Sequence, residues 1–330
     1  MSSPHPHLHP KANASGWLAW HVHVPADGSG TDRISPLVRE NLPALITPLQ
    51  EAGRLRSWFF IRYWEGGPHL RIRLLPQAGV RPAELDAAVR RAFAGLPSQG
   101  HSPQEYLRSI GDLAAASTAS DPTVDQRLAA TVLAPGVHPA VYEPETARYG
   151  SRAALEASEA AFAVSSELAL RAAGSPLDGL RLRLLGIEVL LKAAALSAPD
   201  ASAGDPVVRQ LRRHADFWRR WSASAPREVF PAEELTRQAT QWADVLAGRG
   251  GVSARALAER SSAVSPWLES LAAVLPLGAA SLGDDAETGL LVSHTHMTLN
   301  RLGIFVHDEF ILAETALRLW SASGEAGGGR

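Results

Sequence analysis

The sequence predicts an α+β protein, with an antiparallel sheet containing a hairpin in the N-terminal half and a mostly helical C-terminal half. Two observations lead to this class. The strand patterns at residues 57–64 and 69–75 are separated by a short turn, and no helix lies between them. Beyond residue 150, apolar residues recur at helical spacing. A doubly wound sheet is disfavoured, because neither a phosphate-binding loop nor a dinucleotide fingerprint is present.

Composition excludes several classes of protein. The chain has 330 residues, a formal net charge of −2 and no cysteine, so disulfide scaffolds, cysteine-ligated metals and cysteine nucleophiles are excluded. The near-neutral charge gives no sign of nucleic-acid binding. The sequence shows neither a secretion signal nor an apolar run of about 18 residues, so we expect a cytoplasmic protein without a membrane span. We expect no cofactor and no metal.

The first strand is expected at residues 17–24, where polar and apolar residues alternate. His21 and His23 face one side of this strand. The apolar residues face the other side: Leu18, Trp20, Val22 and Val24.

The hairpin follows. Residues 57–64 are dense in aromatic and β-branched side chains, which is typical of a buried strand. Residues 65–68 form a turn, and residues 69–75 alternate strictly. In this second strand the apolar side chains face one way and the polar ones the other: Leu70, Ile72 and Leu74 against His69, Arg71 and Arg73.

Helices account for most of the remaining chain. A helix over residues 33–51 is expected to be kinked or broken by its prolines, and another follows Pro82. Further helices are expected over residues 152–173, 177–196, 205–223, 233–248, 253–275 and 286–321. We expect a single domain over residues 16–321, with a disordered tail at 1–15 and a flexible, glycine-rich tail at 322–330.

The first candidate site is the polar side of the hairpin strand. Arg71 and Arg73 are two residues apart, so their side chains project side by side, roughly 7 Å apart. Paired guanidinium groups suit a carboxylate or a developing enolate, because they stay charged and bind oxyanions with two hydrogen bonds. The alternative is a solvated polar face of an edge strand.

The second candidate is the segment YEPETARYG at residues 142–150. A loop this polar and aromatic can form the wall of a site. It can equally be a structural clasp, in which Arg148 pairs with Glu143 or Glu145.

The third candidate is SHTHMTLNR at residues 293–301. On a helix, His296 lies one turn before Asn300, whose amide could orient the imidazole ring. His294 and His296 point in different directions on a helix, so a zinc pair is not expected. A histidine satisfied by its surroundings, without a chemical role, is the alternative.

Taken together and in this order, the three segments resemble the lantibiotic dehydratase C-terminal domain family, also called thiopeptide-type bacteriocin biosynthesis proteins. FFIRYWEGGPHLRIRL at residues 59–74 resembles the family's first signature. Residues 142–150 resemble the second signature, and HMTLNR at residues 296–301 the third. The resemblance covers about residues 16–320.

The resemblance implies a lyase that matures ribosomally made peptides. Family members remove glutamate from glutamylated serine or threonine of a precursor, leaving dehydroalanine or dehydrobutyrine. It implies the precursor peptide, with leader and core, as partner, together with a separate glutamylating dehydratase subunit. The family's elimination residues fall on Arg71, Arg73, Arg148 and His296, with substrate binding expected at His69, Tyr142, Glu145, Tyr149 and Asn300.

Two alternative functions stay open. Some free-standing relatives are pyridine synthases, which join two dehydroalanines by a formal aza-[4+2] cycloaddition and release the leader peptide. Gly150-Ser151 stands where many elimination domains have two glycines, which leaves room for this branch. The other alternative is a non-catalytic subunit that delivers the precursor and has no need of His296.

Overall fold

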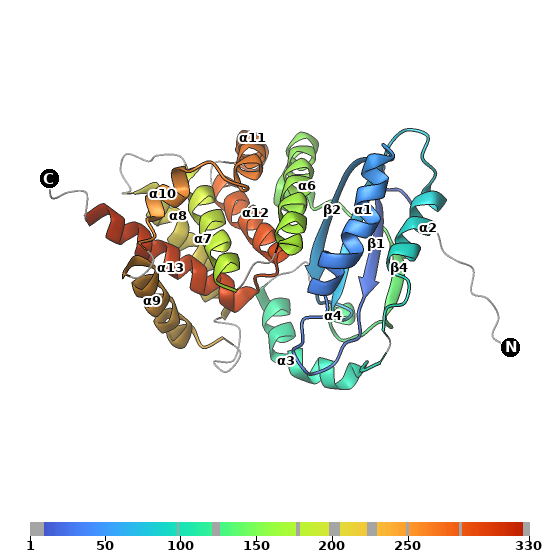
Figure 1. Ribbon diagram of the computed structural model, residues 1–330, viewed down its shortest axis with the longest axis horizontal. Helices are drawn as coiled ribbons and strands as arrows, with labels where there is room; N and C mark the ends of the chain where they lie inside the picture. Colours follow the sequence, from blue (N-terminus) through green and yellow to red (C-terminus); the bar gives the residue numbers. More distant parts are fainter. Residues whose placement is uncertain are drawn as a thin grey trace. The chain divides into compact units, whose positions relative to one another are not determined.

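The computed structural model describes residues 10–97, 99–120, 126–175, 179–197, 205–222, 230–248, 251–283 and 286–325. It confirms the α+β class, with an antiparallel sheet in the N-terminal half and helices in the C-terminal half (Figure 1). Contacts between Cα atoms divide the chain into two compact units. Unit 1 comprises residues 1–111 and 124–144, and unit 2 comprises residues 112–123 and 145–330.

The expected tails at 1–15 and 322–330 fall largely outside the described residues. The single domain over residues 16–321 stays a prediction.

Unit 1 is built on a four-stranded sheet in the order β2-β3-β1-β4. Its strands are β1 (Leu18–His23), β2 (Leu55–Tyr63), β3 (His69–Pro76) and β4 (Gly136–Ala140). All neighbouring pairs are antiparallel, and β2 and β3 form the expected hairpin. β3 therefore lies inside the sheet and not at its edge.

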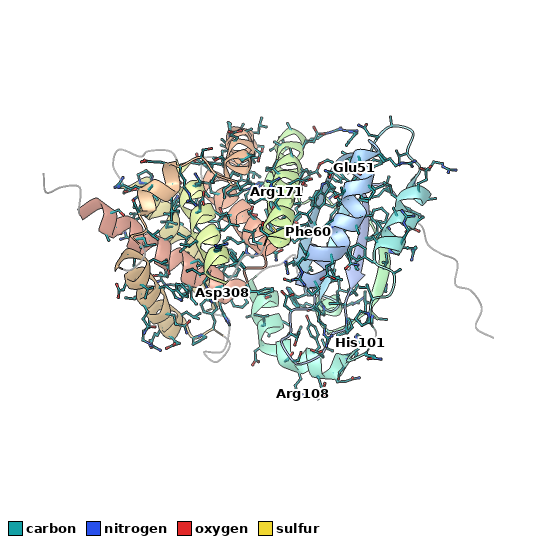
Figure 2. The ribbon with its side chains drawn as sticks, in the orientation of Figure 1. Glu51, Phe60, His101, Arg108, Arg171 and Asp308 are labelled. Carbon is teal, nitrogen blue, oxygen red and sulfur yellow. The ribbon has the colours of Figure 1, made fainter. Side chains whose placement is uncertain are left out.

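One face of this sheet is the core of unit 1. Leu70, Ile72 and Trp20 are completely buried there, as is Phe60, which is labelled in Figure 2. The indole nitrogen of Trp20 donates a 2.9 Å hydrogen bond to Asp86, which ties the sheet to a helix. The expected separation of apolar and polar faces is confirmed.

Two helices accompany the core face, α1 (Leu42–Glu51) and α2 (Pro82–Ala92), and Figure 1 shows α1 lying along the sheet. A short π-helix, η1 (Leu37–Asn41), precedes α1. The expected kink in residues 33–51 thus takes the form of a π-helical turn entering α1. Pro43, near the start of α1, lacks the N–H that a continuous α-helix would need.

Four elements of the described structure are absent from the sequence-based expectation. These are β4 and three helices, α3 (Pro103–Ser120), α4 (Gln126–Ala129) and the short α5 (Thr146–Tyr149). β4 carries Gly136 and Pro139, which are depleted in strands, so its local sequence favours a loop. Its place at the edge of the sheet, beside β1, tolerates the proline.

Unit 2 is helical. Its helices are α5 (Thr146–Tyr149), α6 (Arg152–Gly174), α7 (Gly179–Ala195), α8 (Pro206–Ser222), α9 (Ala232–Gly248), α10 (Ala254–Glu259), α11 (Ser265–Leu282), α12 (Ala286–Leu302) and α13 (Val306–Glu325). α6 packs against α11 and α12, and α13 packs against α7, α8 and α9.

Two expected helices are each divided in two. The pattern over residues 253–275 becomes α10 and α11, and that over 286–321 becomes α12 and α13. The second break falls at Gly303, whose φ of 82° ends α12 in a left-handed conformation. Apolar spacing continues through this second break, because α12 and α13 both pack against α7 and α8.

Gly150 separates α5 from α6 and has φ 90° and ψ −146°, a conformation that essentially only glycine adopts. A Cβ atom at this position would also collide with Ser281 and Leu282 of α11. Directly after it, the Ser151 hydroxyl accepts a hydrogen bond from the Ala154 amide and caps α6.

We predict that Gly150→Ala lowers the free energy of unfolding by ~2–3 kcal/mol, because backbone strain and overpacking act together. Urea unfolding followed by far-UV circular dichroism measures the change. Gly289→Ala is the matched control, since it lies in α12 with open space around it and is expected to stabilise by ~0.5–1 kcal/mol. Equal stability of Gly150→Ala and the natural protein would show that this turn tolerates a side chain.

Candidate functional site

Each unit contains a cluster of side chains suited to chemistry. The sheet cluster, in unit 1, lies on the sheet face opposite the core and consists of His21, His23, His69, Arg71, Arg73 and His138. The helix cluster, in unit 2, consists of His214, His296 and Glu309.

Strand pairing assembles the sheet cluster. His21 is opposite Arg71, and His23 is opposite His69, in the β1–β3 ladder. The rings of His23 and His69 stack with centroids 4.2 Å apart, and His21 lies 4.9 Å from His69. His138 of β4 meets His23 edge to face at 5.1 Å. Four imidazoles from three strands therefore gather on one face.

Arg71 is held by three neighbours. Its guanidinium carbon lies 3.3 Å from the centroid of the Tyr63 ring. Its Nε donates to His69 Nε2 at 3.2 Å, and its Nη2 is 3.8 Å from the Glu65 carboxylate. These contacts fix the position of the positive charge.

Arg73 is 8% exposed, and its guanidinium carbon lies 5.8 Å and 5.5 Å from the ring centroids of Phe59 and Tyr142. Because β3 is an interior strand and Arg73 is buried, the alternative of a solvated edge-strand face is wrong. Because the residue is an arginine, its side chain keeps its positive charge at every physiological pH.

Two histidines of the sheet cluster, His21 and His23, are uncharged at neutral pH. Burial, followed by the charges of Arg73 and Arg71, lowers the pKa of His21 to about 2. Burial and the neighbouring His138 and Arg71 lower the pKa of His23 to about 3, against an opposing contribution from the Gly66 backbone. This face therefore combines neutral imidazoles with arginine cations.

The helix cluster is organised by one buried carboxylate. Glu309 of α13 is 0% exposed, and its two oxygens lie 2.8 Å from His296 Nδ1 and 2.7 Å from His214 Nε2. Asp308, the residue before it, is labelled in Figure 2. The His296 side chain is 24% exposed, so its ring is held from inside and reachable from outside.

Electrostatics keeps Glu309 ionised. Burial by itself raises the pKa of this carboxyl, but the charge of His296 and hydrogen bonds from His214 and His296 outweigh it and hold the pKa at about 2. A carboxylate acceptor places the imidazole proton on the nitrogen that faces it. For His296 this is Nδ1, which leaves Nε2 as the acceptor. This is the arrangement of a positioned general acid–base group.

The neighbouring histidine has a structural role. His294 is 1% exposed, its Nε2 lies 3.2 Å from the Ser158 hydroxyl, and its ring stacks on Phe162 at 5.1 Å. It therefore faces α6, whereas His296 faces α13, as the helical spacing predicts. The orienting partner of His296 Nδ1 is Glu309, where the sequence suggested the Asn300 amide.

The segment 142–150 contains the clasp considered above, an ion pair of 3.2 Å between Arg148 and Glu145. Tyr149 is buried, and its hydroxyl lies 3.0 Å from that of Ser293 on α12. Tyr142, in unit 1, is buried edge to face against Trp17. Contact of these tyrosines with substrate stays a prediction.

The candidate residues are divided between the units. His69, Arg71, Arg73 and Tyr142 belong to unit 1, whereas Glu145, Arg148, Tyr149, His296 and Asn300 belong to unit 2. The convergence of Arg71, Arg73, Arg148 and His296 on one pocket stays a prediction.

The sequence did not indicate Glu309, His214 or His138 as site residues. Glu309 and His214 come from different helices, and no spacing relates them to His296. His138 lies on β4, whose glycine and proline favour a loop in the local sequence. The alternation of His21 and His23 was visible, but their pairing with His69 depends on strand register.

Residues 17–320 match the family described as lantibiotic biosynthesis dehydratase C-term, and the chain belongs to this family. No curated protein matches the chain. Among the described residues, no helix has the length and apolar character needed to cross a membrane.

Three solved structures share the fold. The pyridine synthase TbtD from thiomuracin biosynthesis is 18% identical, with a TM-score of 0.65 over 94% of this chain and 99% of its own. TsrL is 15% identical, with a TM-score of 0.60 over 94% and 95%. The tRNA-dependent lantibiotic dehydratase MibB from Microbispora sp. 107891 is 21% identical, with a TM-score of 0.54 over 97% of this chain and 29% of MibB. The likeness extends to the fold, and both TbtD and MibB are biosynthetic enzymes.

His294 makes stability depend on pH. Burial and the charge of Arg301 lower its pKa to about 3, whereas an unfolded histidine titrates near 6.5. Below pH 6.5 the unfolded state therefore binds one more proton, and the free energy of unfolding falls as pH falls toward 3.

We predict that His294→Phe lessens the loss of unfolding free energy between pH 6 and 5 by ~1.4 kcal/mol per pH unit. Urea unfolding at each pH measures this slope, and an unchanged slope would contradict the neutral buried ring.

Proposed function

We propose that this protein eliminates glutamate from glutamylated serine and threonine residues of a ribosomally made precursor peptide. The product is dehydroalanine or dehydrobutyrine. The observation that carries the proposal is the accessible His296 ring, whose Nδ1 is held 2.8 Å from the buried, ionised Glu309.

Elimination needs a base for the Cα proton of the modified residue. In the proposed mechanism His296 Nε2 takes this proton, the Cβ–O bond breaks, and glutamate leaves as a carboxylate. Glu309 keeps the ring in the required tautomer and stabilises the imidazolium that forms. A positioned acid–base group of this kind contributes ~10²–10⁴-fold to rate.

The arginines supply the positive charge. Removal of the Cα proton places negative charge on the adjacent carbonyl oxygen, and the leaving glutamate carries carboxylates. Arg71, Arg73 and Arg148 are assigned to these groups, because fixed guanidinium groups stabilise developing oxyanions without reorganising.

Pyridine synthesis is the second candidate. The likeness to TbtD, which spans nearly all of both chains, and the Gly150-Ser151 sequence favour it. This cycloaddition also requires proton transfers, so His296 and Glu309 have the same use in either reaction. The proposed partner in both cases is the precursor peptide, and the proposed location is the cytoplasm. For elimination, the glutamylating activity is assigned to a separate subunit.

Two substrates distinguish these functions. We predict that a glutamylated precursor loses one glutamic acid per modified site and keeps its leader, as measured by mass spectrometry. Leader release from a dehydrated, thiazole-bearing precursor without any glutamate loss would replace elimination by pyridine synthesis. Binding of the precursor with neither reaction would favour the non-catalytic delivery subunit.

We predict that His296→Ala slows the reaction by ~10²–10⁴-fold and leaves precursor binding nearly unchanged. The matched control is His307→Ala, an exposed histidine of the same unit outside the cluster, which is expected to keep full activity. Full activity of His296→Ala with both substrates would remove the acid–base assignment.

Glu309 is a positioning residue, and its substitution separates positioning from binding. We predict that Glu309→Gln lowers kcat by ~10²-fold or more with KM within ~3-fold, because the amide can stabilise the wrong tautomer of His296. Far-UV circular dichroism verifies that the variant is folded. A change confined to KM would show that Glu309 serves binding or folding instead.

A further inference from the structure

The sheet cluster contains two histidines, His21 and His23, that have no role in the proposed elimination, and they lie beside His69. Three of its histidines, His21, His23 and His69, each offer one ring nitrogen, and these nitrogens all lie within 4.8 Å of one another. The ladder between β1 and β3 brings them together from segments nearly fifty residues apart.

Within the described part of the chain, the ring nitrogens of His23 are buried without a well-formed hydrogen bond. The residue is 1% exposed, and neither ring nitrogen has a hydrogen-bond partner of acceptable geometry among the described residues. Leaving such a group unsatisfied in a protein interior costs ~1–3 kcal/mol. A buried imidazole without a hydrogen bond, beside two others, is therefore suited to bind a ligand.

His69 is already oriented as a metal ligand. Its Nδ1 lies 2.8 Å from the carbonyl oxygen of Gly67 and donates to it, which leaves the lone pair on Nε2. Metal-binding histidines characteristically donate their second nitrogen to a carbonyl or carboxylate in this way. Arg71 Nε, at 3.2 Å, shows that His69 Nε2 is a hydrogen-bond acceptor.

We propose that His21, His23 and His69 bind one divalent transition-metal ion, such as Zn²⁺. Neutral imidazoles suit zinc, copper, nickel and iron, whereas magnesium and calcium prefer oxygen ligands. Three protein ligands leave a coordination position for water or for an anionic group.

The site has to contract when it binds the metal. A tetrahedral zinc ion with bonds of ~2.0–2.1 Å separates its ligand atoms by ~3.3 Å, so the nitrogens close in by at most ~1.5 Å. The stacked rings of His23 and His69, 21° from parallel, must rotate apart for their nitrogens to converge. Arg71 must also release His69 Nε2.

Two arginines and one glutamate lie near the proposed metal ion and affect its binding in opposite directions. Arg71 and Arg73 repel a cation, which favours an anion as the remaining ligand. Glu65 partly offsets the arginines, because its carboxylate is buried, accepts a 2.8 Å hydrogen bond from Tyr63 and lies 3.8 Å from Arg71 Nη2. Arg71 therefore has a partner to which it can turn when it releases His69.

The test is metal binding by the full-length chain, with any affinity tag removed. In every protein the alternating histidines near the N-terminus are replaced by alanine, so that they cannot contribute: His5, His7 and His9. After treatment with a chelator, the protein is titrated with ZnCl₂ by calorimetry and with CoCl₂ by visible absorption. We predict one equivalent of Zn²⁺, and the intense d–d bands of a low-coordinate Co²⁺ site.

Variants assign the ligands. We predict that His23→Gln and His69→Gln each weaken Zn²⁺ binding at least ~10-fold. His101→Gln is the matched control, a histidine of the same unit outside the cluster, which is expected to bind as the parent does. Circular dichroism verifies that each variant is folded. If a variant does not fold, the Co²⁺ spectrum of the parent protein still tests whether a low-coordinate metal site is present.

The absence of saturable Zn²⁺ and Co²⁺ binding in the parent would overturn the proposal. Equal Zn²⁺ affinity of folded His23→Gln and His101→Gln would also overturn it. Because the readout is binding, either outcome leaves the proposed elimination chemistry untouched.

Discussion

The register of β1 against β3 is the constraint on which unit 1 depends. Pairing Trp20 with Ile72 places both on the buried side, because side chains alternate along each strand. The same pairing necessarily sets His21 beside Arg71 on the other side. A shift of one residue would exchange the two faces and bury the cations against α1 and α2. The free-energy cost of burying these cations in the core therefore fixes the register of β1 against β3.

In unit 2 the corresponding constraint is the carboxylate of Glu309. Burying an isolated carboxylate is very unfavourable, and two imidazoles compensate for it from α8 and α12. These three helices are therefore linked by hydrogen bonds to one carboxylate as well as by apolar packing. The arrangement serves stability and chemistry together, since one of the imidazoles that hydrogen-bond the buried carboxylate is also the accessible one.

The two clusters contain different kinds of chemical group. The sheet cluster carries fixed positive charge on arginines, together with imidazole nitrogens that can act as ligands. The helix cluster carries an oriented proton donor and acceptor. Within one family fold, a lantibiotic dehydratase and a pyridine synthase are both found. Charge stabilisation and proton transfer are general enough to serve elimination or cyclisation, so the fold by itself does not select the reaction.

The sequence by itself determined the α+β class, the hairpin, the division of β3 into two faces and most helices, because these depend on local periodicity. It also carried the motifs that place the chain in its family. Only the tertiary structure decided that β4 is a strand, that Glu309 orients His296, and that His23 meets His69. These features join residues distant in sequence, and their partners are chosen by packing and strand register, which leave no signature in local spacing.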